Sequence, residues 1–314
     1  MKQARTISGF FLTYNTIIIF VVLVVASSFL SDVFFTERNI FNLLRQVTPN
    51  GIVSMGMLLI ILTGGIDLSV GAVLALASVL SALLAEDLGL TLALSVSIGA
   101  GAAVGVFHGV LVAWRNMAPF VVTLAGMTIA RGLAYIFSKA APIPIPNDAA
   151  FLRDFSVNYT LGLPNPVLAM LAVFLLTWGV LRLTSFGRLV VAIGSNETAV
   201  KLAGIRTGWY KFWVYVIGGA FCGIAGIIST TRTNVGSANV GISLELDSIA
   251  AVVIGGASLN GGRGSALNTM IGVLVLGLIG NIMNLMDVPA YPQQVIKGVI
   301  IVAAVFMQTL KKEA

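Results

Sequence analysis

The sequence predicts an all-α fold, a polytopic transmembrane bundle of about ten helices that forms a single domain over residues 1–314. Only 10% of the residues are charged and 58% are hydrophobic, whereas soluble domains carry about 25% charged residues. Seven uncharged runs approach or exceed the length of about 20 residues that a helix needs to cross the hydrocarbon. They are 6–31, 46–66, 68–85, 88–114, 155–181, 212–231 and 264–286. The composition excludes a water-soluble fold.

Gaps between charges, combined with Gly, Pro and Asn breaks, divide the chain into ten expected helices. They are 10–30, 40–62, 68–85, 91–114, 117–138, 163–183, 210–230, 245–257, 265–286 and 291–310. The eighth is short for a full crossing. The first follows Lys2 and Arg5, as a signal-peptide core would, but its uncharged run of 26 residues exceeds the usual core of about 7–15. We expect this helix to be retained.

The distribution of basic residues predicts the orientation of the bundle. With the N-terminus inside, 11 of the 18 Lys and Arg residues fall in cytoplasmic segments and 5 in outer segments, as the positive-inside rule requires. Residues 184–209 carry the densest basic charge and are expected in the cytoplasm, together with both termini. Residues 139–162 are expected outside, and Pro142, Pro144 and Pro146 predict an extended segment rather than a helix there.

Several classes of chemistry are excluded or disfavoured by the residues present. The only histidine, His108, has no acid or cysteine within a helical turn in the sequence, and we expect a structural role for it. The single cysteine, Cys222, rules out a disulfide framework or a cysteine metal site. No Gly-Lys pair exists, so this chain has no phosphate-binding loop for ATP. Without basic clusters interleaved with aromatics, no nucleic-acid partner is expected. The chain is predicted to be no enzyme and to bind no cofactor or metal.

Residues 184–209 contain the signals of a short helix that does not cross the membrane. Ser195 or Asn196 can cap it, Glu197 lies in its first turn and four residues before Lys201, and Gly204 supplies a C-terminal stop. Such a helix could press into a groove on a cytoplasmic partner or rest on lipid headgroups, and the residues alone favour neither. Its expected apolar contact residues are Val200, Leu202 and Ile205.

A second segment interrupts an apolar stretch at Thr63-Gly64-Gly65-Ile66-Asp67. Broken helices at membrane depth tend to line a cavity, and a carboxylate there is costly. The alternative is a tight turn at the inner surface in which Asp67 only caps the next helix. Asp67 could also be the coupling carboxylate of an ion-driven secondary transporter. A partial echo, Gly255-Gly256, follows 191 residues after the first glycine pair, and this echo is compatible with an internal duplication or with chance.

Two basic residues, Arg131 and Lys297, lie inside expected helices. They either face an outward-opening cavity or pair with Glu245, Asp247 or Asp287. The polar groups expected to contact hydroxyl groups of a substrate are Thr63, Asn281, Asn284, Gln293 and Gln294. The complete set expected along a translocation path is Thr63, Gly64, Gly65, Asp67, Asn281, Asn284, Arg131 and Lys297.

The segments 61–71, 187–205 and 245–264 together resemble the ribose-type permeases of bacterial ABC sugar importers, and the resemblance runs from about residue 34 to 297. It implies a type II ABC importer permease in the inner membrane that moves a pentose or hexose from periplasm to cytoplasm by alternating access. It also implies four partners: a second copy or a homologous permease, a cytoplasmic ATPase subunit with two nucleotide sites for ATP and Mg, a periplasmic sugar-binding protein, and the lipid bilayer.

The same resemblance implies that residues 184–209 contain the coupling helix that contacts the ATPase. The residues it assigns to this contact are Gly187, Arg188, Asn196, Glu197, Ala199, Leu202 and Gly204. Ser195 departs from the pattern, since relatives often carry glycine at this position. A secondary transporter using Asp67 is the alternative function, and a membrane enzyme is disfavoured because no His, Cys or acid cluster occurs.

The topology can be tested with single cysteines at positions 148 and 201. A membrane-impermeant thiol reagent added to intact cells should label Asp148→Cys and leave Lys201→Cys unlabelled, because the charge asymmetry places these positions on opposite sides. Labelling after permeabilisation is the control for both. The reverse pattern would contradict the orientation.

Overall fold

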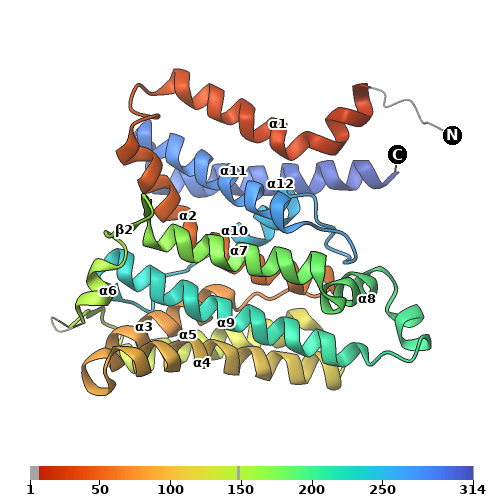
Figure 1. The fold of residues 1–314 in the computed structure, drawn as a ribbon, viewed down its shortest axis with the longest axis horizontal. Helices are drawn as coiled ribbons and strands as arrows, with labels where there is room; N and C mark the ends of the chain where they lie inside the picture. The colour runs from red at the N-terminus through yellow and green to blue at the C-terminus, as the bar shows by residue number, and fades with distance from the viewer. Residues whose placement is uncertain (1–6, 147–148, 314) are drawn as a thin grey trace.

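The computed structural model describes residues 7–146 and 149–313, which form a bundle of helices aligned with the long axis of the molecule (Figure 1). The helices are α1 (Ile7–Leu30), α2 (Glu37–Leu62), α3 (Val70–Leu88), α4 (Leu90–Gly109) with its continuation η1 (Val110–Trp114), α5 (Pro119–Ser138), α6 (Ala150–Asp154), α7 (Asn165–Leu183), α8 (Ser185–Leu202), α9 (Thr207–Thr233), α10 (Leu244–Ile254), α11 (Ala266–Leu285) and α12 (Ala290–Glu313). Two antiparallel pairs join β1 (Ile143–Pro144) to β4 (Val235–Gly236) and β2 (Tyr159–Thr160) to β3 (Leu163–Pro164).

Each of the ten expected segments corresponds to a long helix or to α10. Within the described residues, seven helices are long and apolar enough to cross a membrane, namely α2, α3, α4 with η1, α5, α7, α9 and α11. The apolar part of α1 that qualifies is shorter, from Thr16 to Leu30. The 11 residues of α10 extend only about 16 Å, less than the hydrocarbon thickness of about 30 Å. The all-α membrane fold is confirmed, and the count of about ten crossings stays a prediction.

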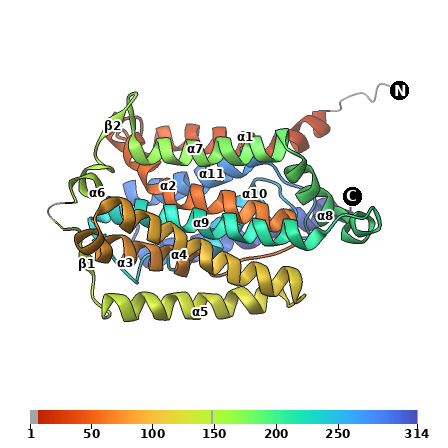
Figure 2. The same ribbon diagram turned by 60° about the horizontal axis from the view of Figure 1, so that its bottom comes forward.

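The centre of the bundle is formed by α2, α3 and α9. Helix α9 packs against α2, α3 and α4, and Figure 2 shows it between α2 and α4. The second half of α2, from Gly51 to Leu62, is buried along its whole circumference. A helix that is apolar on every side is typical of a position at the centre of a bundle. This placement explains why α2 carries no charge after Arg45.

Close packing of α4 on α9 depends on glycines that recur every four residues. Gly101 and Gly105 of α4 face Gly219 and Tyr215 of α9. A Cβ atom added at Gly105 would lie 2.3 Å from the carbonyl oxygen of Tyr215, and one added at Gly219 would lie 2.2 Å from that of Gly101. Small residues at this spacing let backbones approach closely, which drives helix association in lipid.

The two ends of the bundle are different. Helix α8 lies at one end with the start of α1 and the end of α12, whereas α6 and the short strands β1 and β2 lie at the other (Figures 1 and 2). Residues 184–209 and the described residues of 139–162 therefore lie at opposite ends of the bundle, as expected. The expectations that rest on Lys2, Arg5, Asn147 and Asp148 fall outside the described residues.

The expectation that 139–162 contains no helix is wrong. Residues Ala150–Asp154 form α6, and its Leu152 is fully buried. The stiffening prolines end at Pro146, so residues after it are free to adopt helical dihedral angles. Burial of Leu152 in a cluster with Ile227 of α9 and Ala93 of α4 favours this turn of helix.

The α4–α9 contact can be tested with Gly105→Leu. The added side chain collides with backbone atoms of Tyr215 and Val216, and overpacking of this kind costs about 1–3 kcal/mol or more. We expect a lower melting temperature of the purified protein in detergent. Gly99→Leu is the matched control, because it lies on α4 where an added Cβ meets no atom within 4 Å. Equal melting temperatures for the two variants would contradict the packing argument.

Candidate functional site

Helix α8 is divided by a kink that creates the expected short helix. Asn196 has non-helical dihedral angles (φ −160°), and its Oδ1 accepts a hydrogen bond from the Ala199 N–H at 2.9 Å. Asn196 is therefore the N-cap, whereas the Ser195 hydroxyl donates back to the Val191 carbonyl. Gly204 closes the helix with φ +81°, as a glycine stop requires. Residues 197–202 thus form a separately capped turn and a half.

Glu197 fixes this short helix to the start of α9. Its carboxylate lies 3.0 Å from Lys201 Nζ and 2.5 Å from Lys211 Nζ, and it accepts a hydrogen bond from the Thr207 hydroxyl at 2.9 Å. Although partial burial raises the pKa of Glu197, hydrogen bonds from Lys211, Lys201 and Thr207 lower it to about 2. Of the three partners, only Lys201 could be predicted from the sequence, because it follows Glu197 by four residues. Thr207 and Lys211 belong to α9 and meet Glu197 only in the folded protein.

The exposed face of the short helix differs in part from the expectation. Leu202 is 85% exposed and Ala199 is also exposed. Val200, however, is buried, and Ile205 is half-buried. The expectation that Val200 offers an apolar contact to a partner is therefore wrong, because this side chain faces the protein's own core.

Two residues in the first half of α8 were also assigned to partner contact, Gly187 and Arg188. Gly187 is buried against α7, where an added Cβ would lie 2.3 Å from the Val180 carbonyl oxygen. Arg188 is exposed. Of the two, only Arg188 presents its side chain to solvent.

The kink of α8 contacts the end of α2 and the loop after α10 through backbone atoms. The Gly262 N–H donates to the Leu62 carbonyl at 3.0 Å. A Cβ at Gly194 would lie 1.8 Å from the Leu62 carbonyl oxygen and 2.4 Å from the Gly262 nitrogen, and one at Gly261 would lie 2.8 Å from the Gly64 nitrogen. We call Leu62, Gly64, Gly194, Gly261 and Gly262 the glycine junction.

Helices α2 and α10 end in the same type of turn. Gly64 and Gly256 have φ of +80° and +82°. The following N–H groups donate to carbonyls five residues earlier, Gly65 to Ile60 at 3.1 Å and Ala257 to Val252 at 3.1 Å, which is the pattern of a Schellman stop. The structure therefore pairs Gly64 with Gly256, one residue away from the sequence echo of Gly64-Gly65 with Gly255-Gly256.

Asp67 is buried at the start of α3. Its Oδ1 accepts hydrogen bonds from the Ser69 N–H at 2.8 Å and the Ser69 hydroxyl at 2.6 Å, and its Oδ2 lies 3.6 Å from His108 Nδ1. The bond to the Ser69 N–H forms an Asx turn just before α3. The N-cap residue of α3 is Ser69, so the alternative in which Asp67 itself caps this helix is wrong. Sequence inspection found no acid near His108, because the fold rather than the local spacing of residues brings Asp67 beside it.

Space for His108 depends on Gly126 of α5, where an added Cβ would lie 1.9 Å from His108 Nε2. Thr123 of the same helix contacts both neighbours of Asp67, since its hydroxyl oxygen accepts a hydrogen bond from the Leu68 N–H at 3.2 Å and lies 3.4 Å from the Ile66 carbonyl. Helix α5 therefore holds the α2–α3 break and His108 together.

The remaining expected path residues make specific contacts within the bundle. Asn281 exchanges amide hydrogen bonds with Asn39 at 2.8 and 3.2 Å, and Asn284 accepts one from Gln293 at 2.8 Å. Arg131 Nη1 donates to the carbonyls of Ala238 and Val240. The Lys297 ammonium pairs with Asp247 at 2.9 Å.

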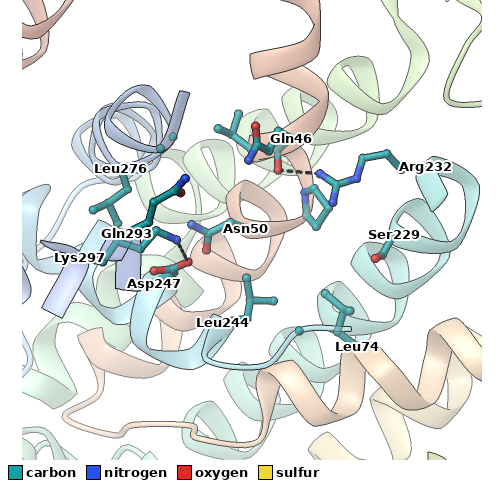
Figure 3. A pocket seen from close by; sticks show the side chains of 15 residues that line it. Gln46, Asn50, Leu74, Ser229, Arg232, Leu244, Asp247, Leu276, Gln293 and Lys297 are labelled. Carbon is teal, nitrogen blue, oxygen red and sulfur yellow. Dashed lines mark hydrogen bonds and ion pairs between the residues drawn. The ribbon is translucent and has the colours of Figure 1, made fainter. Parts of the chain in front are cut away.

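A cavity of about 240 Å³ opens between α2, α3, α9, α10, α11 and α12 (Figure 3). Its lining residues are Gln46, Val47, Pro49, Asn50, Leu74, Ser229, Arg232, Gly241, Leu244, Asp247, Leu276, Gly277, Gly280, Gln293 and Lys297. Among the expected path residues, Lys297 lines this cavity, and Thr63, Gly64, Gly65 and Asp67 lie elsewhere in the described structure. The assignment of the latter four to the path stays a prediction.

Most polar residues of the cavity were missed from the sequence. Gln46 and Asn50 lie within the expected second span, and polar side chains in a membrane helix are themselves a signal of function. Arg232 was counted only as a basic residue of an outer segment, and Asp247 only as one possible partner for Arg131 or Lys297. Sequence alone could not gather them, because they come from different helices and meet only after the bundle is packed.

Comparison with known proteins gives a family and several relatives. A family model described as branched-chain amino acid transport system / permease component matches residues 39–305. The ribose import permease protein RbsC of Bacillus subtilis is 42% identical over 291 residues, 92% of this chain and 90% of that protein. RbsC of Escherichia coli K12 is 38% identical over 95% and 94% of the two chains, and the L-arabinose transport system permease protein AraH of the same strain is 35% identical over 96% and 92%. No solved structure matches.

The role of Glu197 can be tested with Glu197→Gln. Loss of the charge weakens the contacts to Lys201 and Lys211, so we expect faster amide hydrogen exchange in residues 197–205 without a change in the spanning helices. Lys201→Gln is the control with a smaller effect, because Lys201 is the more exposed of the two lysines. Exchange in 197–205 that is unchanged in Glu197→Gln would contradict the proposed role of the carboxylate.

The pH dependence of the parent protein has a defined sign. Because the folded-state pKa of Glu197 lies near 2, below the ordinary 4.5, its stabilising contribution is complete above pH 4.5 and disappears as the pH falls towards 2. Protection of residues 197–205 in the parent should therefore decrease over this range.

Proposed function

The chain belongs to the permease family of branched-chain amino acid transport systems, and from this premise we propose that it is the membrane subunit of an ATP-driven importer of a monosaccharide. Relatives that match more than nine-tenths of this chain are named for ribose and L-arabinose, which supports a sugar rather than an amino acid as the substrate. The observation that carries the proposal is the separately capped helix 197–202, which presents Leu202 at one end of a membrane bundle.

A cytoplasmic ATPase that holds ATP and Mg at two nucleotide sites would dock on the exposed face of this helix, with Leu202 entering a groove. Glu197 and its lysine partners hold the helix to α9, so a push on it reaches the bundle. At the glycine junction, α8 touches the end of α2 and the loop after α10 through backbone atoms. Because these contacts are between backbone atoms, a movement of α8 cannot be taken up by rotation of side chains at the junction. The junction would therefore pass the movement of α8 to both helix ends.

The other partners follow from the same proposal. The permease would pair with a second copy or a homologous permease and would alternate between outward-facing and inward-facing states. A periplasmic sugar-binding protein would dock at the opposite end, where α6 and the short strands β1 and β2 lie (Figure 2). In this proposal the protein lies in the bacterial inner membrane, and both termini face the cytoplasm.

An ion-coupled secondary transporter using Asp67 is the competing function. The carboxylate of Asp67 is already engaged by Ser69 and lies beside His108, and it does not line the cavity. Uptake of D-ribose or L-arabinose that needs no ATPase and follows the proton gradient would favour this alternative over an ATP-driven importer.

The docking face can be tested with Leu202→Asp and Ala199→Arg. Each change places a charge on an apolar contact, and we expect retention of the ATPase during purification to fall about tenfold or more, as for a hot-spot residue. Uptake of pentose into proteoliposomes should fall with it. Leu161→Asp is the control for ATPase retention alone, because this leucine is 90% exposed at the opposite end of the bundle. Normal ATPase retention and normal uptake in both docking variants would overturn the assignment.

A further inference from the structure

The cavity of Figure 3 is a substrate site contained within one protomer. We infer that it holds a single neutral monosaccharide, and that Asn50 and Asp247 hydrogen-bond to the sugar hydroxyls. This inference rests on the proposed function and adds the position of the sugar and the residues that contact it. The helices of one chain hold the sugar, rather than only a surface between two copies.

The dimensions of the cavity fit a small ligand. Its volume of about 240 Å³ lies just below the range of about 300–1,000 Å³ found for drug-sized ligands. Apolar walls come from several leucines, and the C–H faces of a sugar ring could pack against them. These leucines are Leu74, Leu244 and Leu276.

The polar lining offers both donors and acceptors at fixed positions. The Ser54 hydroxyl donates to Asn50 Oδ1 at 3.3 Å, which leaves the Asn50 amide N–H groups for a ligand. Lys297 occupies one oxygen of Asp247, and the other has no hydrogen-bond partner among the described residues. A sugar hydroxyl donates one hydrogen bond and accepts others. An amide donor and a carboxylate acceptor facing one space therefore suit a polyol.

The charges of the lining favour a neutral ligand over an anion. Lys297 is neutralised by Asp247 at 2.9 Å, and an anion would be repelled by that carboxylate. Arg232 donates to the Gln46 carbonyl at 3.4 Å and lies on the other side of the cavity in Figure 3. Arg232 makes no ion pair with a described residue, but it faces the Asp247 carboxylate across the cavity, so the two together form only a weak site for an anion.

Gly280 provides a way to fill the cavity without straining the protein. It is buried on α11 and lines the cavity, yet an added Cβ would meet no atom within 4 Å. A leucine at this position would therefore extend into the cavity. Gly179 of α7 is the matched control, because it also has no atom within 4 Å of an added Cβ and does not line the cavity.

The experiment uses the full permease, assembled with its ATPase and binding protein in proteoliposomes, with D-ribose and L-arabinose as probes. Gly280→Leu should lower uptake at least about tenfold while the assembly and its ATP hydrolysis persist, and Gly179→Leu should behave like the parent. Asn50→Leu, which removes one neutral hydrogen-bonding group, should lower uptake about threefold to tenfold. Parental uptake in Gly280→Leu would overturn the cavity site and leave the proposed function intact.

A second measurement does not depend on transport. In Gly280→Cys, either pentose should slow the reaction of the new thiol with a small thiol reagent, whereas the thiol of Gly179→Cys should react at the same rate with and without sugar. Protection by anionic phospholipid but not by sugar would replace the sugar with a lipid and overturn the inference, as would no protection at all. If the parent assembly hydrolyses ATP but imports neither pentose, the proposed substrate class fails, and sugar protection of Gly280→Cys then decides the cavity separately.

Discussion

Direct backbone contact at the glycine junction is the constraint on which the arrangement of the bundle depends. Inside a membrane, every peptide group freed by a broken helix needs a partner within the protein or in a water-filled space. The Leu62 carbonyl at the end of α2 finds its partner in the Gly262 N–H. Because Gly194 and Gly261 have no side chains, α8 and the loop after α10 come close enough to close this contact. The same absence of side chains makes the junction stiff.

The α2–α3 break and the cavity use their polar groups in different ways. At the α2–α3 break, Asp67, Ser69, Thr123 and His108 form a buried cluster that holds α3, α4 and α5 together. Around the cavity, polar groups instead surround an open space, and Lys297 and Asp247 neutralise each other at its wall. Buried polar groups in a membrane protein are costly unless paired or hydrated. The first set is mainly structural, and the second is available to a ligand.

The α8 segment shows how a surface helix becomes rigid without burial. Its cap at Asn196, its stop at Gly204 and the three partners of Glu197 restrain it from both ends and from one side. The backbone that carries the exposed Leu202 is thereby restrained. A preordered backbone loses little conformational freedom on binding, which would favour association with the proposed ATPase partner.

The sequence by itself determined the membrane class, the approximate positions of ten helices and the short capped helix after Asn196, because these depend on local composition, spacing and caps. The short helix α6 and the first half of α8 were not predicted. Tertiary structure alone decided which polar residues meet. Asp67 and His108, Glu197 and Lys211, and Asp247 and Lys297 lie on different helices, and no local pattern records their contact. The tertiary structure also decided that Val200 faces inward, since burial depends on the neighbouring helices rather than on residue type. The cavity belongs to this second group, because its lining comes from helices far apart in the chain.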